Sequence, residues 1–519
     1  MRNRQFGWAE LVLAFTIIFG ALVRFVPTVL AHSVINDGGL FYTMMGEIRG
    51  NGFLLPLFTT YNHLSIPFAY PPLSLYLGAL LSATGIPASS VIRWLPPLLS
   101  TLCIPAFYWM ALQLLGARGT ASLATLAYAL MPSSFSWYVM GGGLSRALGI
   151  LFLLLTCASA WRLFERPSVQ RAAITAVFGA GAVMSHPETG LHTLAVGILI
   201  WLFRGRTRHG LRSALMVALG VLALSSPWWL TVILRHGLAP VLSALNTGGH
   251  SGLFWLPLVT FDFAEETFVT LFTALALIGL AMRCIQREWL LPVWILIAFV
   301  VEPRSASAIA TLPLALLAGV ALGDFVLPNL EKVALGAQAD FGDWTSGMDR
   351  TAAMRIVLAY VMLSGLVGAF SHGLSLATYV VPDASQAALQ WVKASTPPGS
   401  RFIVLTGRSE PFSDPTVEWF PTLTDRTSVN TIQGREWILG RKFTAFRTDL
   451  DVLASCPNAG PGCLTAWAAR WMTGFEYVLL EKPGGKVGVA SSLLEYRLRQ
   501  DAGYRVAFEN AAAVIFQHK

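Results

Sequence analysis

Long apolar segments recur along most of this chain, and they constrain its fold more than any other feature. The first, residues 8–30, would form a helix of about 35 Å, enough to cross a bilayer core of roughly 30 Å. The apolar segments cover residues 8–30, 95–115, 120–139, 145–163, 171–184, 190–203, 212–233, 268–283, 288–301, 306–326 and 355–377. Hydrophobic residues make up 55% of the chain and charged residues only 12%, a composition too apolar for a soluble protein of 519 residues. The sequence therefore predicts a polytopic α-helical membrane protein with about eleven spans and additional interfacial helices.

The distribution of arginine predicts how these spans are oriented. Arg2 and Arg4 precede the first span, which places the N-terminus in the cytoplasm, and the absence of a small-residue cleavage site indicates a retained helix. Residues 72–86 are short and begin with two prolines, so we interpret them as a re-entrant or interfacial helix. A span there would put the arginines of residues 204–212 outside.

With this topology the basic turns all lie on the cytoplasmic side of the cell membrane, and the C-terminus lies outside. The arginines concerned are Arg118, Arg162, Arg166, Arg171, Arg204, Arg206, Arg208, Arg212, Arg283 and Arg287. Much of the net charge of +8 is therefore explained by membrane topology, and it requires no nucleic-acid partner.

Near residue 381 the composition changes to that of a soluble domain. We predict a transmembrane domain over residues 1–380 and an extracytoplasmic α/β domain over residues 381–519. Strands are expected at residues 401–406, 477–480 and 505–516, and helices at residues 384–394 and 491–500. Cys456 and Cys463, in CPNAGPGC, predict a disulfide in an oxidising compartment, which we favour over a metal site because no other Cys or His lies nearby.

The outer loop after the first span, residues 31–94, is more elaborate than a simple connector. Asp37 follows the span directly and therefore lies at a membrane surface. Beyond Gly38 and Gly39, apolar residues recur at helical spacing, which predicts a helix lying in the membrane interface. These residues are Leu40, Phe41, Met44, Met45 and Ile48. Asp37 is our principal catalytic candidate, and the alternative is that it only caps this helix.

Two further polar groups are expected at the outer ends of spans. His186 and Glu188, in SHPETGLH, could bind a divalent metal or the acceptor, or could simply form a polar turn. Asp262, Glu265 and Glu266, in FDFAEET, could face the first-loop aspartate across a cavity, or could only favour the dipole at a helix start. The sequence identifies no cofactor, and a divalent metal such as Mg²⁺ or Mn²⁺ stays open.

Arg304 lies between two strongly apolar segments, where an arginine costs roughly 2.5–3.5 kcal/mol at the bilayer centre. Its guanidinium suits the phosphate of a membrane-embedded donor, and the alternative is pairing with lipid headgroups or with Glu302. Glu302 is itself a candidate for binding substrate or metal. Arg146, in MGGGLSRALG, is a second phosphate candidate, unless residues 141–143 serve only helix packing. No glycine loop typical of nucleotide binding accompanies these residues.

Taken in this order, the motifs resemble the GT-C superfamily of membrane glycosyltransferases. The similarity is greatest to dolichyl-phosphate-mannose protein mannosyltransferases and bacterial aminoarabinose transferases. It is carried by the loop from Asp37 to Gly52, by YPPL at residues 70–73, by the arginine before TLP at residues 304–313, and by the C-terminal outer domain. The resemblance covers roughly residues 1–377.

This resemblance implies a polyprenyl-phosphate sugar donor and inverting transfer to a lipid, glycan or protein acceptor on the outer side. Asp37 would then be the base, and Arg304 would bind the donor phosphate. The chain departs from the family pattern where Asp37-Gly38 replaces Asp-Glu, and where Tyr70 replaces a basic residue before Pro-Pro. The sugar and the acceptor therefore stay open.

A transporter is the competing class of protein, because many spans with scattered polar residues would suit one. Transporters commonly contain internal repeats and place ionisable groups near the middle of the membrane. Here the acidic residues collect at the outer ends of spans and a sizeable soluble domain follows. These features favour the enzyme.

Overall fold

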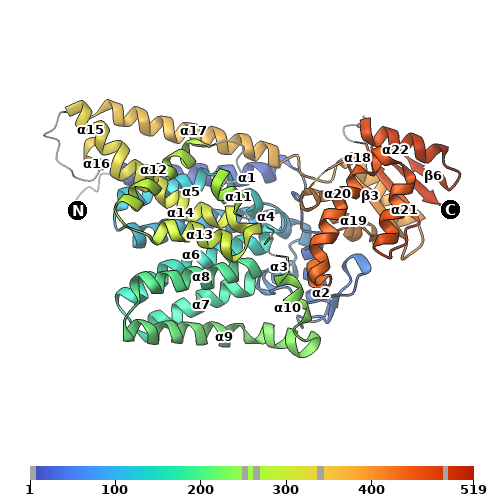
Figure 1. Ribbon diagram of the computed structural model, residues 1–519, viewed down its shortest axis with the longest axis horizontal. Helices are drawn as coiled ribbons and strands as arrows, with labels where there is room; N and C mark the ends of the chain where they lie inside the picture. Colours follow the sequence, from blue (N-terminus) through green and yellow to red (C-terminus); the bar gives the residue numbers. More distant parts are fainter. Residues whose placement is uncertain are drawn as a thin grey trace.

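The structure, a computed structural model, describes residues 7–247, 250, 255–260, 269–335, 344–408, 410–482 and 489–519. A long bundle of helices carries a smaller α/β domain at one end, and the C-terminus lies in that domain (Figure 1). The helices before the α/β domain are α1 Trp8–Leu30, α2 Gly39–Gly50, α3 Leu73–Ala83, α4 Ala88–Leu115, α5 Arg118–Leu130, α6 Gly143–Glu165, α7 Val169–Ser185, α8 Pro187–Arg204, α9 Arg208–His236, α10 Ala239–Leu245, α11 Leu256–Thr260, α12 Leu271–Ile285, α13 Leu290–Val301, α14 Ala306–Val320, α15 Leu327–Leu335, α16 Trp344–Gly347 and α17 Ala352–Leu376.

Several of these helices are suited to crossing a membrane. Within the described ranges, six helical segments are long and apolar enough: α1, α4, α6, α9, Pro303–Leu335 and α17. The pair α12 and α13, bent by 118°, counts as a seventh if it forms one span. The protein is therefore an integral membrane protein.

The predicted number of about eleven spans exceeds this count because some apolar helices are short. Helices α5 and α7 have 13 and 17 residues. The span predicted at residues 120–139 is wrong in its second half: α5 ends at Leu130, and Pro132, which cannot donate a backbone hydrogen bond, begins a 3₁₀ turn. Residues 72–86 contain α3, whose 11 residues are too few to span a membrane. This length agrees with the prediction of an interfacial or re-entrant helix.

Helix α2 is the short helix predicted in the outer loop, but its apolar face does not lie against lipid. Leu40, Phe41, Met44, Met45 and Ile48 are all buried within the protein. They pack in one cluster with aromatic residues of the outer loop and of the α/β domain, among them Tyr61, Phe68, Trp419 and Trp437. The 12-residue helix is thus part of the junction between the two domains.

Among its described residues, the α/β domain contains one five-stranded sheet and five α-helices. The strands are β3 Arg401–Leu405, β4 Thr427–Ser428, β5 Tyr477–Glu481, β6 Tyr504–Glu509 and β7 Ala513–His518, and the helices are α18 Asp383–Ser395, α19 Pro415–Thr424, α20 Phe443–Ala459, α21 Pro461–Arg470 and α22 Val489–Gln500. In the sheet order β4-β3-β5-β7-β6, strand β3 is parallel to β4 and β5, whereas β7 is antiparallel to both its neighbours.

The single strand predicted at residues 505–516 is a hairpin of β6 and β7. Asn510 reverses the chain, because its side-chain oxygen accepts hydrogen bonds from the N–H groups of Ala512 and Ala513. Cys456 in α20 and Cys463 in α21 are joined by a disulfide. Helix α19 of this domain packs against α2 of the outer loop, and this contact brings the two domains together at the candidate site.

Candidate active site

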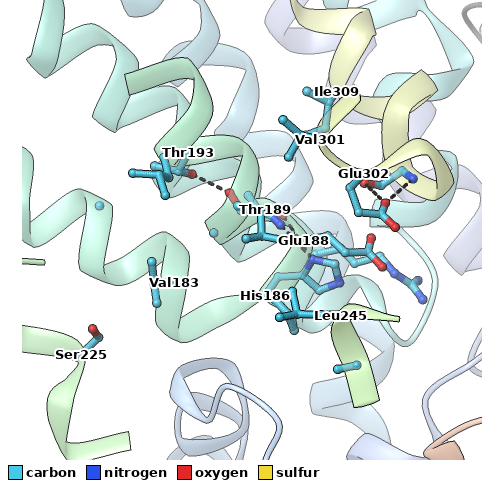
Figure 2. A pocket seen from close by; sticks show the side chains of 18 of the residues that line it. Val183, His186, Glu188, Thr189, Thr193, Ser225, Leu245, Val301, Glu302 and Ile309 are labelled. Carbon is cyan, nitrogen blue, oxygen red and sulfur yellow. Dashed lines mark hydrogen bonds between the residues drawn. The ribbon is translucent and has the colours of Figure 1, made fainter. Parts of the chain in front are cut away.

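A cavity of about 1510 Å³ lies where the bundle meets the α/β domain. Its polar lining includes Asp37, Arg146, His186, Glu188, Glu302, Arg304, Glu418 and Glu436. An apolar wall from α7, α8 and α9 continues the cavity, and Figure 2 shows Val183 and Ser225 along this wall, away from the charged group around Glu188. The predicted candidates Asp262, Glu265 and Glu266 lie outside the described residues.

Asp37 is buried, with 6% of its surface exposed, and both of its carboxylate oxygens are held. The backbone N–H of Gly142 donates to Oδ1 at 2.8 Å, and Nη2 of Arg146 lies 2.6 Å from Oδ2. The capping interpretation is wrong, because the N-cap of α2 is Gly38, which has no side chain, and the oxygens of Asp37 bind Gly142 and Arg146 instead of α2. The N–H groups of Gly39 and Leu40 donate instead to Glu418.

The triple glycine before Arg146 makes the contact with Asp37 sterically possible. The N–H of Gly141 donates to the carbonyl of Ile35 at 2.9 Å. A Cβ on Gly141 would lie 1.8 Å from the carbonyl oxygen of Asp37, and one on Gly142 would lie 2.4 Å from Oδ2. These glycines therefore allow backbone to approach the aspartate, and their function is not limited to helix packing.

His186 and Glu188 lie at the turn between α7 and α8, which faces the cavity (Figure 2). Nδ1 of His186 accepts a hydrogen bond from the N–H of Thr189 and so caps α8. Burial lowers the pKa of His186 to about 4, so the ring is neutral at pH 7. The charges of Glu188, Arg146 and Arg304 also act on this pKa, because these side chains line the same cavity as the ring.

Arg304 forms an ion pair with Glu188, and its Nε lies 4.0 Å from Oε1 of Glu302. The predicted alternative, pairing with Glu302, is thus only the longer of two contacts. The guanidinium also lies 5.8 Å from the centre of the Phe412 ring, in the α/β domain. Arg304 therefore contacts side chains of both the bundle and the α/β domain.

Glu302 caps the 3₁₀ turn Pro303–Ser305 that leads into α14, and its Oε2 accepts hydrogen bonds from the N–H and the hydroxyl of Ser305, each at 2.8 Å. Oε1 has no hydrogen-bond partner among the described residues. Burial, and next the charge of Glu188, raise the pKa of Glu302 to about 8. This carboxyl is therefore protonated over much of the range around pH 7 and lines the cavity as a neutral group.

The predicted metal set does not assemble in the part of the chain that the structure describes. No group of three or more His, Cys, Asp or Glu side chains there is arranged to hold a metal ion. The carboxylate of Glu188 is paired with Arg304, and the Nδ1 of His186 is used by Thr189. In this structure both side chains are therefore held by protein partners.

The sequence did not single out Glu418 and Glu436, which line the cavity from the α/β domain. Glu418 contacts α2 directly, and Oε2 of Glu436 has no hydrogen-bond partner among the described residues. In the sequence, the only indication is that this glutamate lies between Val417 and Trp419 in an apolar run. A buried carboxylate needs hydrogen-bond partners, so such a residue indicates a contact with another part of the protein.

No family model and no curated protein matches this chain. Solved structures do match: ArnT from Cupriavidus metallidurans bound to undecaprenyl phosphate covers 98% of this chain and 98% of its own, with a TM-score of 0.53 and 16% identity. The arabinofuranosyltransferase AftD from Mycobacteria covers 98% of this chain and 40% of its own, with a TM-score of 0.54 and 17% identity.

These similarities establish the fold. The chain shares the fold of ArnT and of AftD, both of the GT-C type that its motifs resemble, and the predicted fold class is confirmed. Within this class the alignment spans nearly the full length of ArnT, including its apo form, which matches with a TM-score of 0.52.

Proposed function

We propose that this protein is a membrane glycosyltransferase that moves a sugar from a polyprenyl-phosphate donor to an acceptor hydroxyl, with inversion and with Asp37 as the base. The observation that carries the proposal is the placement of Asp37: a buried carboxylate, oriented through both oxygens, in a large cavity that joins arginine side chains to an apolar wall. The GT-C fold supports the same reaction class.

The chemistry needs a base and a cation. The acceptor oxygen attacks the anomeric carbon while the bond from that carbon to the phosphate oxygen breaks, and the phosphate leaves with the electron pair. Asp37 takes the proton of the acceptor hydroxyl, since a carboxylate oxygen that already accepts one hydrogen bond retains a further lone pair. Attack from the face opposite the leaving phosphate inverts the anomeric carbon.

Arg304 and Arg146 are the proposed partners of the donor phosphate. Negative charge develops on the leaving phosphate, and guanidinium groups stabilise it through bidentate hydrogen bonds. Each arginine is paired in this structure, with Glu188 and with Asp37 respectively, so a phosphate would share or replace a carboxylate contact. The apolar wall of α7, α8 and α9 would accept the polyprenyl chain, and the ArnT structure bound to undecaprenyl phosphate supports this lipid class.

We further propose that the cavity and the α/β domain face the outer side of the cell membrane. The arginine-rich turns that follow α6 and α8 lie together, because Arg204 pairs with Glu165, and Arg171 donates to the carbonyls of Arg162 and Arg166. The charged side chains of the cavity, among them Arg146 and Glu188, lie at the opposite ends of α6 and α8, whereas its apolar wall extends along these helices as far as Leu163 and Trp201. The positive-inside rule then places the basic turns in the cytoplasm.

The function is tested with purified protein in liposomes that contain a radiolabelled polyprenyl-phosphate sugar and a panel of lipid, glycan and peptide acceptors. Release of free polyprenyl phosphate together with label on an acceptor is the expected result. Movement of intact donor or sugar across the bilayer without cleavage of its phosphate bond would contradict the proposal and identify a transporter.

A further inference from the structure

We propose that the α/β domain completes the active site, with Glu418 as the positioning residue that holds the Asp37 loop in its productive conformation. This inference rests on the proposed function, because it assigns Glu418 a role in the reaction of Asp37. It makes the domain a structural part of catalysis rather than an appended module.

The first contact that carries the inference is the one between Glu418 and the start of α2. Oε2 of Glu418 accepts from the N–H of Gly39 at 2.9 Å, and Oε1 accepts from the N–H of Leu40 at 3.1 Å. Those two N–H groups are among the unpaired donors of a helix N-terminus, and no residue next to α2 caps them. A side chain 379 positions away thus fixes the backbone two residues after Asp37.

The backbone just before Asp37 is held from the same domain. The indole N–H of Trp419 donates to the backbone carbonyl of Asn36 at 2.9 Å, and the side-chain amide of Asn36 donates to the carbonyl of Phe412 at 3.0 Å. Helix α19 and the turn before it therefore hold the chain on both sides of the catalytic candidate.

The loop conformation requires such support. Asn36 has a φ of 52° and Gly38 a φ of 137°, so Asp37 lies between two residues in the left-handed half of backbone space. Conformations of this kind persist when the surroundings fix them. A Cβ on Gly38 would lie 3.2 Å from the Trp419 ring and 3.2 Å from Gly141, which shows how closely the loop is enclosed.

Further contacts fix α19 over the outer loop. The hydroxyl of Tyr61 donates to the carbonyl of Glu418 at 2.6 Å. The side chain of Asn62 exchanges two hydrogen bonds with the backbone of Ser428, at 2.8 and 2.7 Å. The carboxyl of Glu418 is therefore delivered to α2 by a rigid interface, which is the arrangement expected of a positioning group.

The test compares Glu418→Ala with Glu481→Ala. Glu481 is another buried glutamate of the same domain, but its partners Ser385 and Thr416 lie within that domain and it does not line the cavity. We call the hydrogen bonds from Gly39 and Leu40 to Glu418 the clamp. Glu418→Ala removes the clamp and should lower kcat about 100-fold with little change in the KM for the donor, because a displacement of about 1 Å at a reacting group can lower the rate about 100-fold. Glu481→Ala should keep the parent kcat even where its unfolding temperature falls.

Hydrogen–deuterium exchange of residues 36–42 is the readout that does not depend on activity. We expect faster exchange in Glu418→Ala and parent-like exchange in Glu481→Ala. If Glu418→Ala does not fold, Trp419→Phe, which keeps an aromatic ring but removes the hydrogen bond to Asn36, should show the same faster exchange and a smaller loss of kcat. Unchanged exchange and unchanged kcat in a folded Glu418→Ala protein would overturn the inference. Faster exchange in Glu418→Ala, with a parent protein that transfers no sugar, would retain the clamp and refute only the proposed function.

Discussion

Replacing Asp37 by Asn separates the proposed base from the structural role of the same side chain. The Asn oxygen can still accept from Gly142, but the Asn amide then faces the guanidinium of Arg146, and two donors meet where an ion pair stood. Leaving such a buried group unsatisfied costs about 1–3 kcal/mol of stability. Loss of a positioned base costs about 10²–10⁴ in rate, or roughly 3–5 kcal/mol of activation free energy.

The α2 helix itself should survive the substitution, because Glu418 rather than Asp37 caps it. The double variant Asp37→Asn/Arg146→Gln removes the donor clash, so we expect it to recover part of the unfolding temperature lost by Asp37→Asn and none of the activity. Transfer is measured at saturating donor in liposomes, and stability by thermal unfolding in the same detergent. A single variant with more than a tenth of the parent rate would refute Asp37 as the base.

Three further predictions address the rest of the site. Arg304→Ala should raise the KM for the donor at least tenfold while unpairing Glu188, and a variant with parent KM would exclude Arg304 as the phosphate ligand. Impermeant thiol labelling from outside should modify a cysteine placed at Gly399 and not one at Gly205, and the reverse pattern would invert the topology. Because the pKa of Glu302 is raised to about 8 from 4.5, its contribution to stability is complete below pH 4.5 and is lost as the pH rises through 8. The unfolding temperature should therefore fall between about pH 5 and pH 8, with a shallower fall in Glu302→Gln, and equal slopes would contradict the buried environment of Glu302.

The sequence was sufficient to predict the elements whose pattern is local. Apolar length predicted the helices of the bundle, and proline positions explain both the short α3 and the early end of α5. The hairpin of β6 and β7 was missed because the reversal at Asn510 interrupts an otherwise strand-like run. Local sequence patterns therefore predict the type of an element better than the residue at which it ends.

The candidate site was predicted only in part, because its assembly depends on contacts between distant segments. The position of Asp37 after the first span indicates a loop that lines the cavity, but the sequence does not predict that Asp37 pairs with Arg146, for which it suggests only phosphate binding or a helix-packing motif. Glu418 was missed as a site residue because its partner, α2, lies 379 positions away and nothing in its own helix marks it. A cap supplied by another domain has no local sequence signature.

A structure with a bound polyprenyl-phosphate sugar tests the central claim most directly. The account predicts that the anomeric carbon lies in the cavity on the side of Asp37, with the phosphate contacted by Arg304 and the lipid chain along α7, α8 and α9. An anomeric carbon that faces Glu302 or Glu436 instead, with Asp37 shielded from it by Arg146, would contradict the assignment of the base.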